Sequence, residues 1–187
     1  MDPVILLDAL HVAERLKDTT RHCYTSGGRH ESVAEHCWRS ALMAYFLKDE
    51  FPDADMHKVI LMCIVHDLGE AFTGDIPTFD KTAADEQKET TLLNQWLSSL
   101  PDCYCSELTE LFAEMDARQT LEARIFKAID GMEAVLQHNE SDLSTWIPHE
   151  FHLNRVYCED KVQFSDYLIQ LRKLLQEETD RKIANEQ

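Results

Sequence analysis

Residues 59–70 read VILMCIVHDLGE, and this stretch decides the fold. Its first seven residues are apolar, which favours a buried helix, and His66 and Asp67 follow at once. Adjacent side chains on an α-helix diverge by about 100°, so both can reach one ion only if the helix ends or turns there. Gly69 and Gly74 supply residues suited to a turn. A polar pair at the end of an apolar helix indicates a metal site inside a core.

The rest of the chain also repeats its apolar residues at helical spacing. Ser32 and Glu35 form a capping-box pattern at the start of one helix, which stops before Pro52. Gly and Pro number only five each in 187 residues, which favours long helices. We therefore expect no strand and a single all-α domain over residues 1–187. The predicted helices cover residues 4–17, 32–50, 55–65, 83–100, 106–117, 121–138 and 161–183, with a loop at 18–30.

The composition excludes several classes of function. The formal net charge is −17, and so acidic a surface repels nucleic acid and anionic membranes. The chain has no run of 18 or more apolar residues and no basic-then-apolar N-terminal segment, so we expect a soluble cytoplasmic protein. Its six cysteines show no disulfide framework for a chain of this size. A small anionic substrate stays compatible, because a buried cation and one or two arginines can reverse the local field.

Four side chains lie where one metal ion can collect them. His66 and Asp67 end the apolar helix, while His36 and Asp130 are polar residues on otherwise apolar helices. A bare carboxylate in the core is costly, which favours a ligand role for Asp130. Two neutral imidazoles and two carboxylates suit Mn²⁺, Fe²⁺, Co²⁺, Ni²⁺ or Zn²⁺, and suit Mg²⁺ less well. Around an octahedral ion they leave two positions for water or substrate oxygen.

Two further acids are candidates for proton transfer. Glu70 lies four residues after His66 and shares its face if the turn continues. It is not needed as a ligand, so it is better placed as a general acid/base for water at the metal. Asp75, within the sequence GDIP at residues 74–77, is the second candidate.

Several of these residues also have simpler interpretations. His66 could favour a helix C-terminus through the helix dipole, with Asp67 on the surface. Asp130 could be an exposed helix acid that pairs with Lys127, three residues earlier. The metal site is the better hypothesis, because His36 and the two acids Glu70 and Asp75 occur at matching positions around the pair. Three histidines near the C-terminal end of the chain have no carboxylate at a sequence spacing typical of metal ligands. We therefore expect them to be loop or surface residues rather than a second metal site. They are His138, His149 and His152.

The spaced motifs resemble those of a known family. His36, the pair His66 and Asp67, and a distant Asp130 are similar to the pattern of HD-domain metal-dependent phosphohydrolases. The bacterial YfbR-type 5′-deoxynucleotidases and their eukaryotic relatives are more similar still, over residues 6–137. The segments that carry this similarity are RHESVAEH at 29–36, HDLGE at 66–70 and GDIP at 74–77.

The resemblance implies an HD-domain helical bundle with its metal-site core at residues 31–137 and a C-terminal helix at 161–183. It implies one divalent metal ion and hydrolysis of (deoxy)nucleoside 5′-monophosphates to nucleoside and phosphate. On the family pattern Glu70 is the general acid/base and Asp75 assists it. The implied metal ligands are His36, His66, Asp67 and Asp130.

The resemblance also implies a set of substrate contacts. Arg21 matches the family's phosphate-binding arginine, and Arg29 is a second phosphate contact from the same loop. His22 stands where the deoxynucleotidases have a tryptophan beside the sugar, so sugar preference is left open. The family tendency to form homodimers is compatible with the acidic helices, and the oligomeric state is left open as well.

Three other functions fit parts of the pattern. An HD-domain phosphatase could act on another small phosphate ester. A di-iron oxygenase on the same scaffold needs extra histidines between Asp67 and Asp130, and none occurs at residues 67–137. A non-catalytic domain that binds metal and nucleotide would not need both Glu70 and Asp75.

Overall fold

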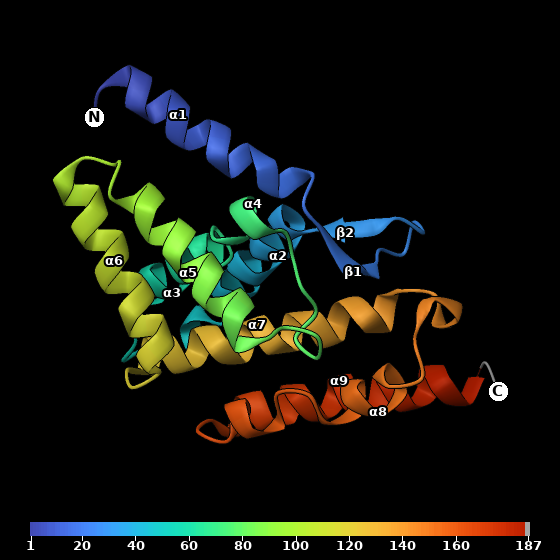
Figure 1. Ribbon diagram of the computed structural model, residues 1–187. Coiled ribbons are helices and arrows are strands. Elements are labelled where there is room, and N and C mark those ends of the chain that lie inside the picture. The colour runs from blue at the N-terminus through green and yellow to red at the C-terminus, as the bar shows by residue number, and fades with distance from the viewer. Residues whose placement is uncertain (186–187) are drawn as a thin grey trace.

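The computed structural model describes residues 1–185 and shows a bundle of helices with one small β-hairpin (Figure 1). Three helices contact one another at its centre: α2 (Val33–Phe46), α3 (Met56–Val65) and α7 (Leu121–Glu140). The other helices surround this centre, and α9 lies along α7. They are α1 (Pro3–Glu14), α4 (Glu70–Thr73), α5 (Ala83–Leu97), α6 (Asp102–Ala117), α8 (Glu150–Val156) and α9 (Asp166–Asn185).

Side chains cap the N-termini of the central helices. Ser32 accepts a hydrogen bond from the backbone N–H of Glu35, whose carboxylate accepts one from the backbone N–H of Ser32. The predicted capping box is therefore confirmed. Asp55 caps α3 by accepting hydrogen bonds from two backbone N–H groups of the first turn, each at 3.1 Å. Thr120 caps α7 in the same way.

The hydrophobic core lies where α2, α3 and α7 face one another. The apolar stretch of α3 is central, as predicted, and burying one such side chain stabilises the fold by about 1.5–3 kcal/mol. Gly131 on α7 has a steric role, because a Cβ atom there would lie 2.6 Å from the Cβ of Cys158. It lets the segment before the final helix pack directly against α7. Fully buried core residues include Val33, Val59, Met62, Cys63, Ile125, Ala128, Ile129 and Met132.

The prediction of no strand is wrong. β1 (Thr20–Tyr24) and β2 (His30–Ser32) form an antiparallel hairpin, with β1 inside the predicted loop and β2 running from its last residue to the residue that caps α2. The strands are too short and too polar to show a clear two-residue period, and an isolated hairpin of this size is marginal. Its stability comes instead from polar side chains that reach from it to α7, as described below.

Other differences concern the ends of helices. α6 begins at Asp102 rather than at residue 106, and α8 follows the Trp-Ile-Pro break at residues 146–148. A short 3₁₀ turn, Glu159–Val162, precedes α9, so the last helix begins at Asp166 rather than at 161. The all-α class is nevertheless confirmed, with the hairpin as the exception within residues 1–185. No helix in this part of the chain combines the length and apolarity needed to cross a bilayer.

Candidate metal centre and active site

α3 ends where the sequence requires it to end. Val65 is its last residue and His66 is the C-cap. The Nδ1 atom of His66 lies 3.0 Å from the backbone carbonyl oxygen of Cys63, and its Nε2 atom lies 3.0 Å from Oδ2 of Asp67. The end of the helix thus brings an imidazole and the next carboxylate to one point, as predicted.

The two glycines after this pair act differently from each other. Gly74 has a φ of 78°, a conformation that favours glycine, and it turns the chain towards Asp75. Gly69 has an ordinary φ of −59°, so a turn conformation is the wrong explanation for it. A Cβ atom at Gly69 would lie 2.7 Å from Cγ of Glu89, so its role is to let α5 approach closely.

The structure brings together the four residues predicted as metal ligands. The Nε2 atom of His36 lies 3.3 Å from Nε2 of His66 and 3.2 Å from Oδ1 of Asp130. The same Asp130 oxygen is 3.7 Å from Nε2 of His66, and Oδ2 of Asp67 is 3.8 Å from Nε2 of His36. Bonds of about 2.1 Å to one tetrahedral ion set ligand atoms about 3.4 Å apart. The ligand atoms of His36, His66 and Asp67 lie within 4.8 Å of one another, and Asp130 lies within 3.7 Å of both histidines, so the four groups can approach one metal ion.

Hydrogen bonds fix which ring nitrogens face this centre. The partner of Nδ1 in His66 is a carbonyl oxygen, which only accepts, so Nδ1 carries the proton. Nδ1 of His36 contacts the carboxylate of Glu133, which also accepts, so this Nδ1 carries a proton as well. In a neutral ring, Nε2 then presents its lone pair to the centre, as in metal-binding histidines. Two lone pairs beside two carboxylates fit a divalent cation.

Neighbouring groups shift the pKa values at the centre. Burial lowers the pKa of His66, but the Asp67 carboxylate and the Cys37 thiol together outweigh it and leave that pKa well above its ordinary value. Burial disfavours ionised Asp130, yet Lys127, whose Nζ lies 2.7 Å from Oδ2, acts together with His36 and His66 to bring the Asp130 pKa well below its usual range. The predicted pair of Lys127 and Asp130 thus exists, but both residues line the cavity described below.

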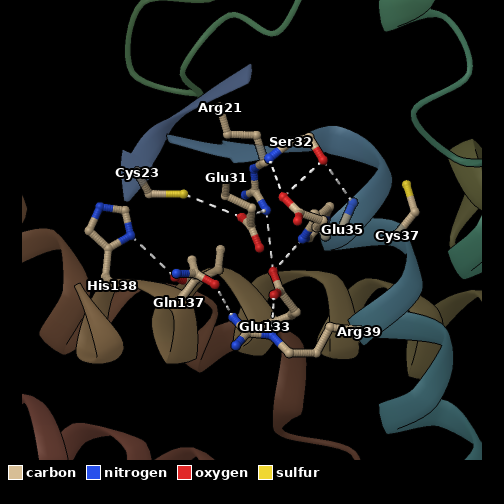
Figure 2. Close-up of polar contacts among 12 residues, drawn as sticks. Arg21, Cys23, Glu31, Ser32, Glu35, Cys37, Arg39, Glu133, Gln137 and His138 are labelled. Atoms are coloured by element: carbon tan, nitrogen blue, oxygen red, sulfur yellow. Dashed lines mark hydrogen bonds and ion pairs between the residues drawn. The ribbon is translucent and has the colours of Figure 1, made fainter. Parts of the chain in front are cut away.

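Glu133 was missed by the sequence analysis and anchors the centre. It lies one turn after Asp130 on α7 and is completely buried. Besides His36, its carboxylate accepts hydrogen bonds from Nη1 of Arg21 at 3.2 Å and from Nε of Arg39 at 2.7 Å. Figure 2 shows Arg21 between Glu133 and Glu31 of the hairpin, which is 3.1 Å from the same Nη1 atom. The signal in the sequence was the three-residue spacing to Asp130, which places both acids on one helix face.

The two predicted acid/base residues lie beside the centre. Glu70 is buried, and its Oε2 atom has no hydrogen-bond partner among the described residues. Burial, reinforced by the carboxylates of Asp67 and Asp75, raises the pKa of Glu70 to about 10. Burial also raises the pKa of Asp75, although Arg21 opposes it. Before any metal binds, Glu70 therefore holds a proton at neutral pH.

A cavity of about 570 Å³ opens onto these groups. His36, Asp67 and Asp130 line it together with Glu70 and Asp75. The wall of the cavity carries six carboxylates and five cations, so cations are available to an anionic ligand although the chain has a formal net charge of −17. These cations are Arg21, Lys81, Arg118, Lys127 and Lys161.

The three predicted substrate contacts are placed differently. Arg21 lines the large cavity and also a side chamber of about 60 Å³, which His22 and Phe79 line as well. Arg29 is exposed and hydrogen-bonded to Glu35, and it does not line the cavity that the described residues form. The structure thus brings Arg21 and His22 to the site but not Arg29.

The expectation about the late histidines is wrong for His138. Its Nε2 atom lies 3.1 Å from Oε1 of Glu150, which is also 2.8 Å from Nε2 of His22. Spacing along the chain could not reveal this cluster, because α8 returns Glu150 to the side of α7.

Comparison with known proteins agrees with the fold. Residues 13–172 match the family model described as HD domain, so the chain belongs to the HD domain family and the predicted resemblance is confirmed. The 5′-deoxynucleotidase HDDC2 of Bos taurus is 32% identical over 139 residues, which are 72% of this chain and 67% of that protein.

Two solved structures are similar as well. One is a predicted metal-dependent phosphohydrolase from Magnetospirillum magnetotacticum, with a TM-score of 0.82, 25% identity, and coverage of 96% of this chain and 95% of that one. The other is the HD phosphohydrolase DatZ of cyanophage S-2L, bound to dA and one catalytic Zn²⁺ ion. It has a TM-score of 0.60 at 23% identity, covering 94% and 96% of the two chains, and shows the fold alone.

Proposed function

We propose that this protein hydrolyses (deoxy)nucleoside 5′-monophosphates to nucleoside and phosphate with one divalent metal ion. The observation that carries the proposal is the convergence of His36, His66, Asp67 and Asp130 at a cavity whose wall also holds Arg21 and four other cations. The name and the similarity of the bovine relative support the substrate class. The metal is drawn from Mn²⁺, Fe²⁺, Co²⁺, Ni²⁺, Zn²⁺ and Mg²⁺, and the histidines disfavour Mg²⁺.

Each residue of the site has a role in this reaction. When bound, the ion supplies the electrophilic and water-activating chemistry of the site. Arg21 donates hydrogen bonds to phosphate oxygens and offsets their charge, as charge-assisted pairs do. Glu70, protonated in the buried site, gives its proton to the leaving 5′-oxygen. Asp75 orients the attacking water and is the second candidate for the proton transfer.

The sugar is proposed to lie in the large cavity, beside the mouth of the side chamber. The side chamber adjoins the large cavity through Arg21, and His22 lies in its wall. This is the residue that replaces the family tryptophan, so sugar preference depends on it. Arg29 is a secondary phosphate contact at most, because its guanidinium is paired with Glu35 at the surface.

The test is phosphate release from a panel of ribo- and deoxyribonucleoside 5′-monophosphates and small phosphate esters, each with Mn²⁺, Co²⁺, Zn²⁺ and Mg²⁺. We expect metal-dependent turnover of the nucleotides that Glu70→Ala abolishes. Glu110→Gln, at an exposed position of α6, is the matched control. Turnover of simple esters alone would favour the alternative phosphatase. Binding of metal and nucleotide without turnover would favour a non-catalytic domain.

A homodimer and a cytoplasmic location stay predictions. Four large apolar side chains are exposed along one face of α2 and offer a surface for self-association. Light scattering on the purified protein measures the oligomeric state directly. The four residues are Trp38, Leu42, Tyr45 and Phe46.

A further inference from the structure

Three metal-ligating side chains meet at the side chamber, outside the centre described above. They come from separate elements: His22 from β1, His138 from α7 and Glu150 from α8. Their ligand atoms all lie within 4.8 Å of one another. Oε1 of Glu150 is the shared neighbour, at 2.8 Å from Nε2 of His22 and 3.1 Å from Nε2 of His138.

The backbone holds two of these groups in a ligand orientation. Nδ1 of His138 lies 3.2 Å from the carbonyl oxygen of Ala134, which only accepts, so Nδ1 is the donor and Nε2 faces Glu150. His66 of the metal centre has the same arrangement, with Nδ1 on a carbonyl one turn earlier. Oε2 of Glu150 accepts a hydrogen bond of 2.8 Å from the backbone N–H of Ile147. This bond leaves Oε1 directed at the two histidines.

His22 supplies an independent observation. Its Nε2 atom is buried and, despite the short distance to Oε1, forms no hydrogen bond of acceptable geometry with the described residues. A buried polar atom without a hydrogen-bond partner needs another explanation, such as an ion that the structure lacks. A proton on His138 would satisfy only the contact of that ring with Glu150. A cation between the three groups satisfies all of them.

We propose that His22, His138 and Glu150 bind a second divalent transition-metal ion of the zinc type. Two imidazoles and one carboxylate form a zinc donor set that leaves one position open. The chamber of about 60 Å³ has room for the water that completes it, since water occupies roughly 30 Å³. Tetrahedral zinc sets its ligand atoms about 3.4 Å apart, so the contacts of Glu150 with His22 and His138, now 2.8 and 3.1 Å, would lengthen by about 0.6 and 0.3 Å.

Such an ion would link the hairpin to α7 and α8. Because it binds the folded chain, it should raise the melting temperature as its concentration rises. This effect should persist when the main centre is disabled by His66→Gln with Asp67→Asn. Zinc bound at the side chamber is then the only high-affinity zinc, and the readout does not depend on phosphatase activity.

Zinc content per chain tests the proposal. The protein is stripped of metal with a chelator and equilibrated with Zn²⁺. Unbound zinc is then removed, and the zinc content is measured by elemental mass spectrometry. We expect two ions in the unmodified protein, and one each in His138→Gln, Glu150→Gln and the His66→Gln/Asp67→Asn variant. His152→Gln changes an exposed histidine of α8 and should keep two ions.

Melting curves with and without Zn²⁺ show whether each variant is folded, so that loss of zinc is not mistaken for loss of structure. The His66→Gln/Asp67→Asn protein should gain several degrees with Zn²⁺, and adding His138→Gln to it should remove the gain. A single ion in the unmodified protein would overturn the proposal. So would two ions that survive both His138→Gln and Glu150→Gln, or no zinc-dependent gain when the main centre is disabled.

Discussion

The Nε2 atoms of His36 and His66 lie 3.3 Å apart, although the residues are 30 positions apart in the chain. Both rings use Nδ1 to donate to an acceptor, so the Nε2 atoms of both rings face one point. The packing of α2, α3 and α7 holds the rings beside carboxylates, which outweigh burial and raise the pKa of both imidazoles. A metal ion therefore competes with protons for the two Nε2 atoms, and metal affinity should fall as the pH falls.

Removal of the metal should therefore abolish phosphate release. Chelation followed by dialysis is expected to lower the rate by at least 100-fold, because the ion supplies the electrophile. Re-addition of Mn²⁺, Co²⁺ or Zn²⁺ should restore it, which a colorimetric phosphate assay measures. His66→Gln should not recover with any of the three ions. Full activity after exhaustive chelation would contradict the metal mechanism.

Glu133→Gln should weaken metal binding without touching the metal. The carboxylate of Glu133 orients the His36 ring. Loss of a residue that orients a metal ligand in this way lowers metal affinity by about 10–100-fold. Arg21 and Arg39 also lose a buried anion, so we expect a stability loss of about 3 kcal/mol in urea unfolding.

Glu140→Gln is the matched control for this change. Glu140 also pairs with Arg39 and lies on the same helix, but its side chain is 45% exposed. Exposed pairs contribute about 0.2–1 kcal/mol, so metal affinity should stay the same and stability should change little. Equal metal affinity in Glu133→Gln and Glu140→Gln would exclude the orienting role.

Glu70→Gln should reduce catalysis and stabilise the metal-free protein. Loss of a general acid costs about 10²–10⁴-fold in kcat. The pKa of Glu70 rises from 4.5 to about 10 on folding, so the unfolded chain ionises first as pH rises. Above pH 4.5 this carboxyl increasingly disfavours folding, up to the native pKa, whereas a neutral amide does not.

The melting temperature of metal-free Glu70→Gln should thus exceed that of the unmodified protein at pH 8. The two should converge near pH 4.5, where the carboxyl is half protonated even in the unfolded chain. Thermal unfolding across this pH range checks the sign. A variant less stable than the unmodified protein at pH 8 would show that Glu70 is ionised in the fold.

Arg21→Lys should raise KM for nucleotides more than it lowers kcat. Lysine keeps the charge but loses the planar fork, and a hydrogen bond to a charged group contributes about 1.5–3 kcal/mol, or roughly 10–100-fold. Some loss of stability is expected as well, because Arg21 pairs with Glu31 and Glu133. Arg29→Lys, outside the cavity, should change KM less than twofold. Similar KM values for the two variants would remove Arg21 from the phosphate site.

Gly131→Ala should disturb the wall next to Asp130. The added Cβ would lie 2.6 Å from Cβ of Cys158, and overpacking of this kind costs about 1–3 kcal/mol. Gly27→Ala is the control, since its Cβ would meet Oγ1 of Thr25 at an ordinary 3.7 Å. Chemical unfolding of both variants measures the difference. Equal stability would mean that the segment around Cys158 moves without cost.

The sequence predicts the helices and the four converging residues because their signals are local and strong. The apolar run ending at His66 and the capping box at Ser32 each specify a helix end, which the structure reproduces. Asp130 is recognisable as a polar residue on an apolar helix. The family pattern supplies the register between these distant segments.

The remainder depends on contacts between segments, which spacing does not encode. In the sequence Glu133 looks like one more helix acid, because its partners Arg21, His36 and Arg39 come from other segments of the chain. The hairpin is too short for a periodic signal, and Glu150 reaches His138 only because α8 folds back. The role of Gly69 is likewise set by Glu89 on another helix.

The location of Arg21 and His22 on a hairpin has an evolutionary consequence. The residues that gather at the metal centre come from packed helices or their ends, where replacement would disrupt the whole bundle. The residues that face the ligand from β1 sit on a small appendage joined to the bundle mainly by side chains. Lineages can therefore diversify what they recognise by altering this appendage, while the reactive machinery is inherited unchanged.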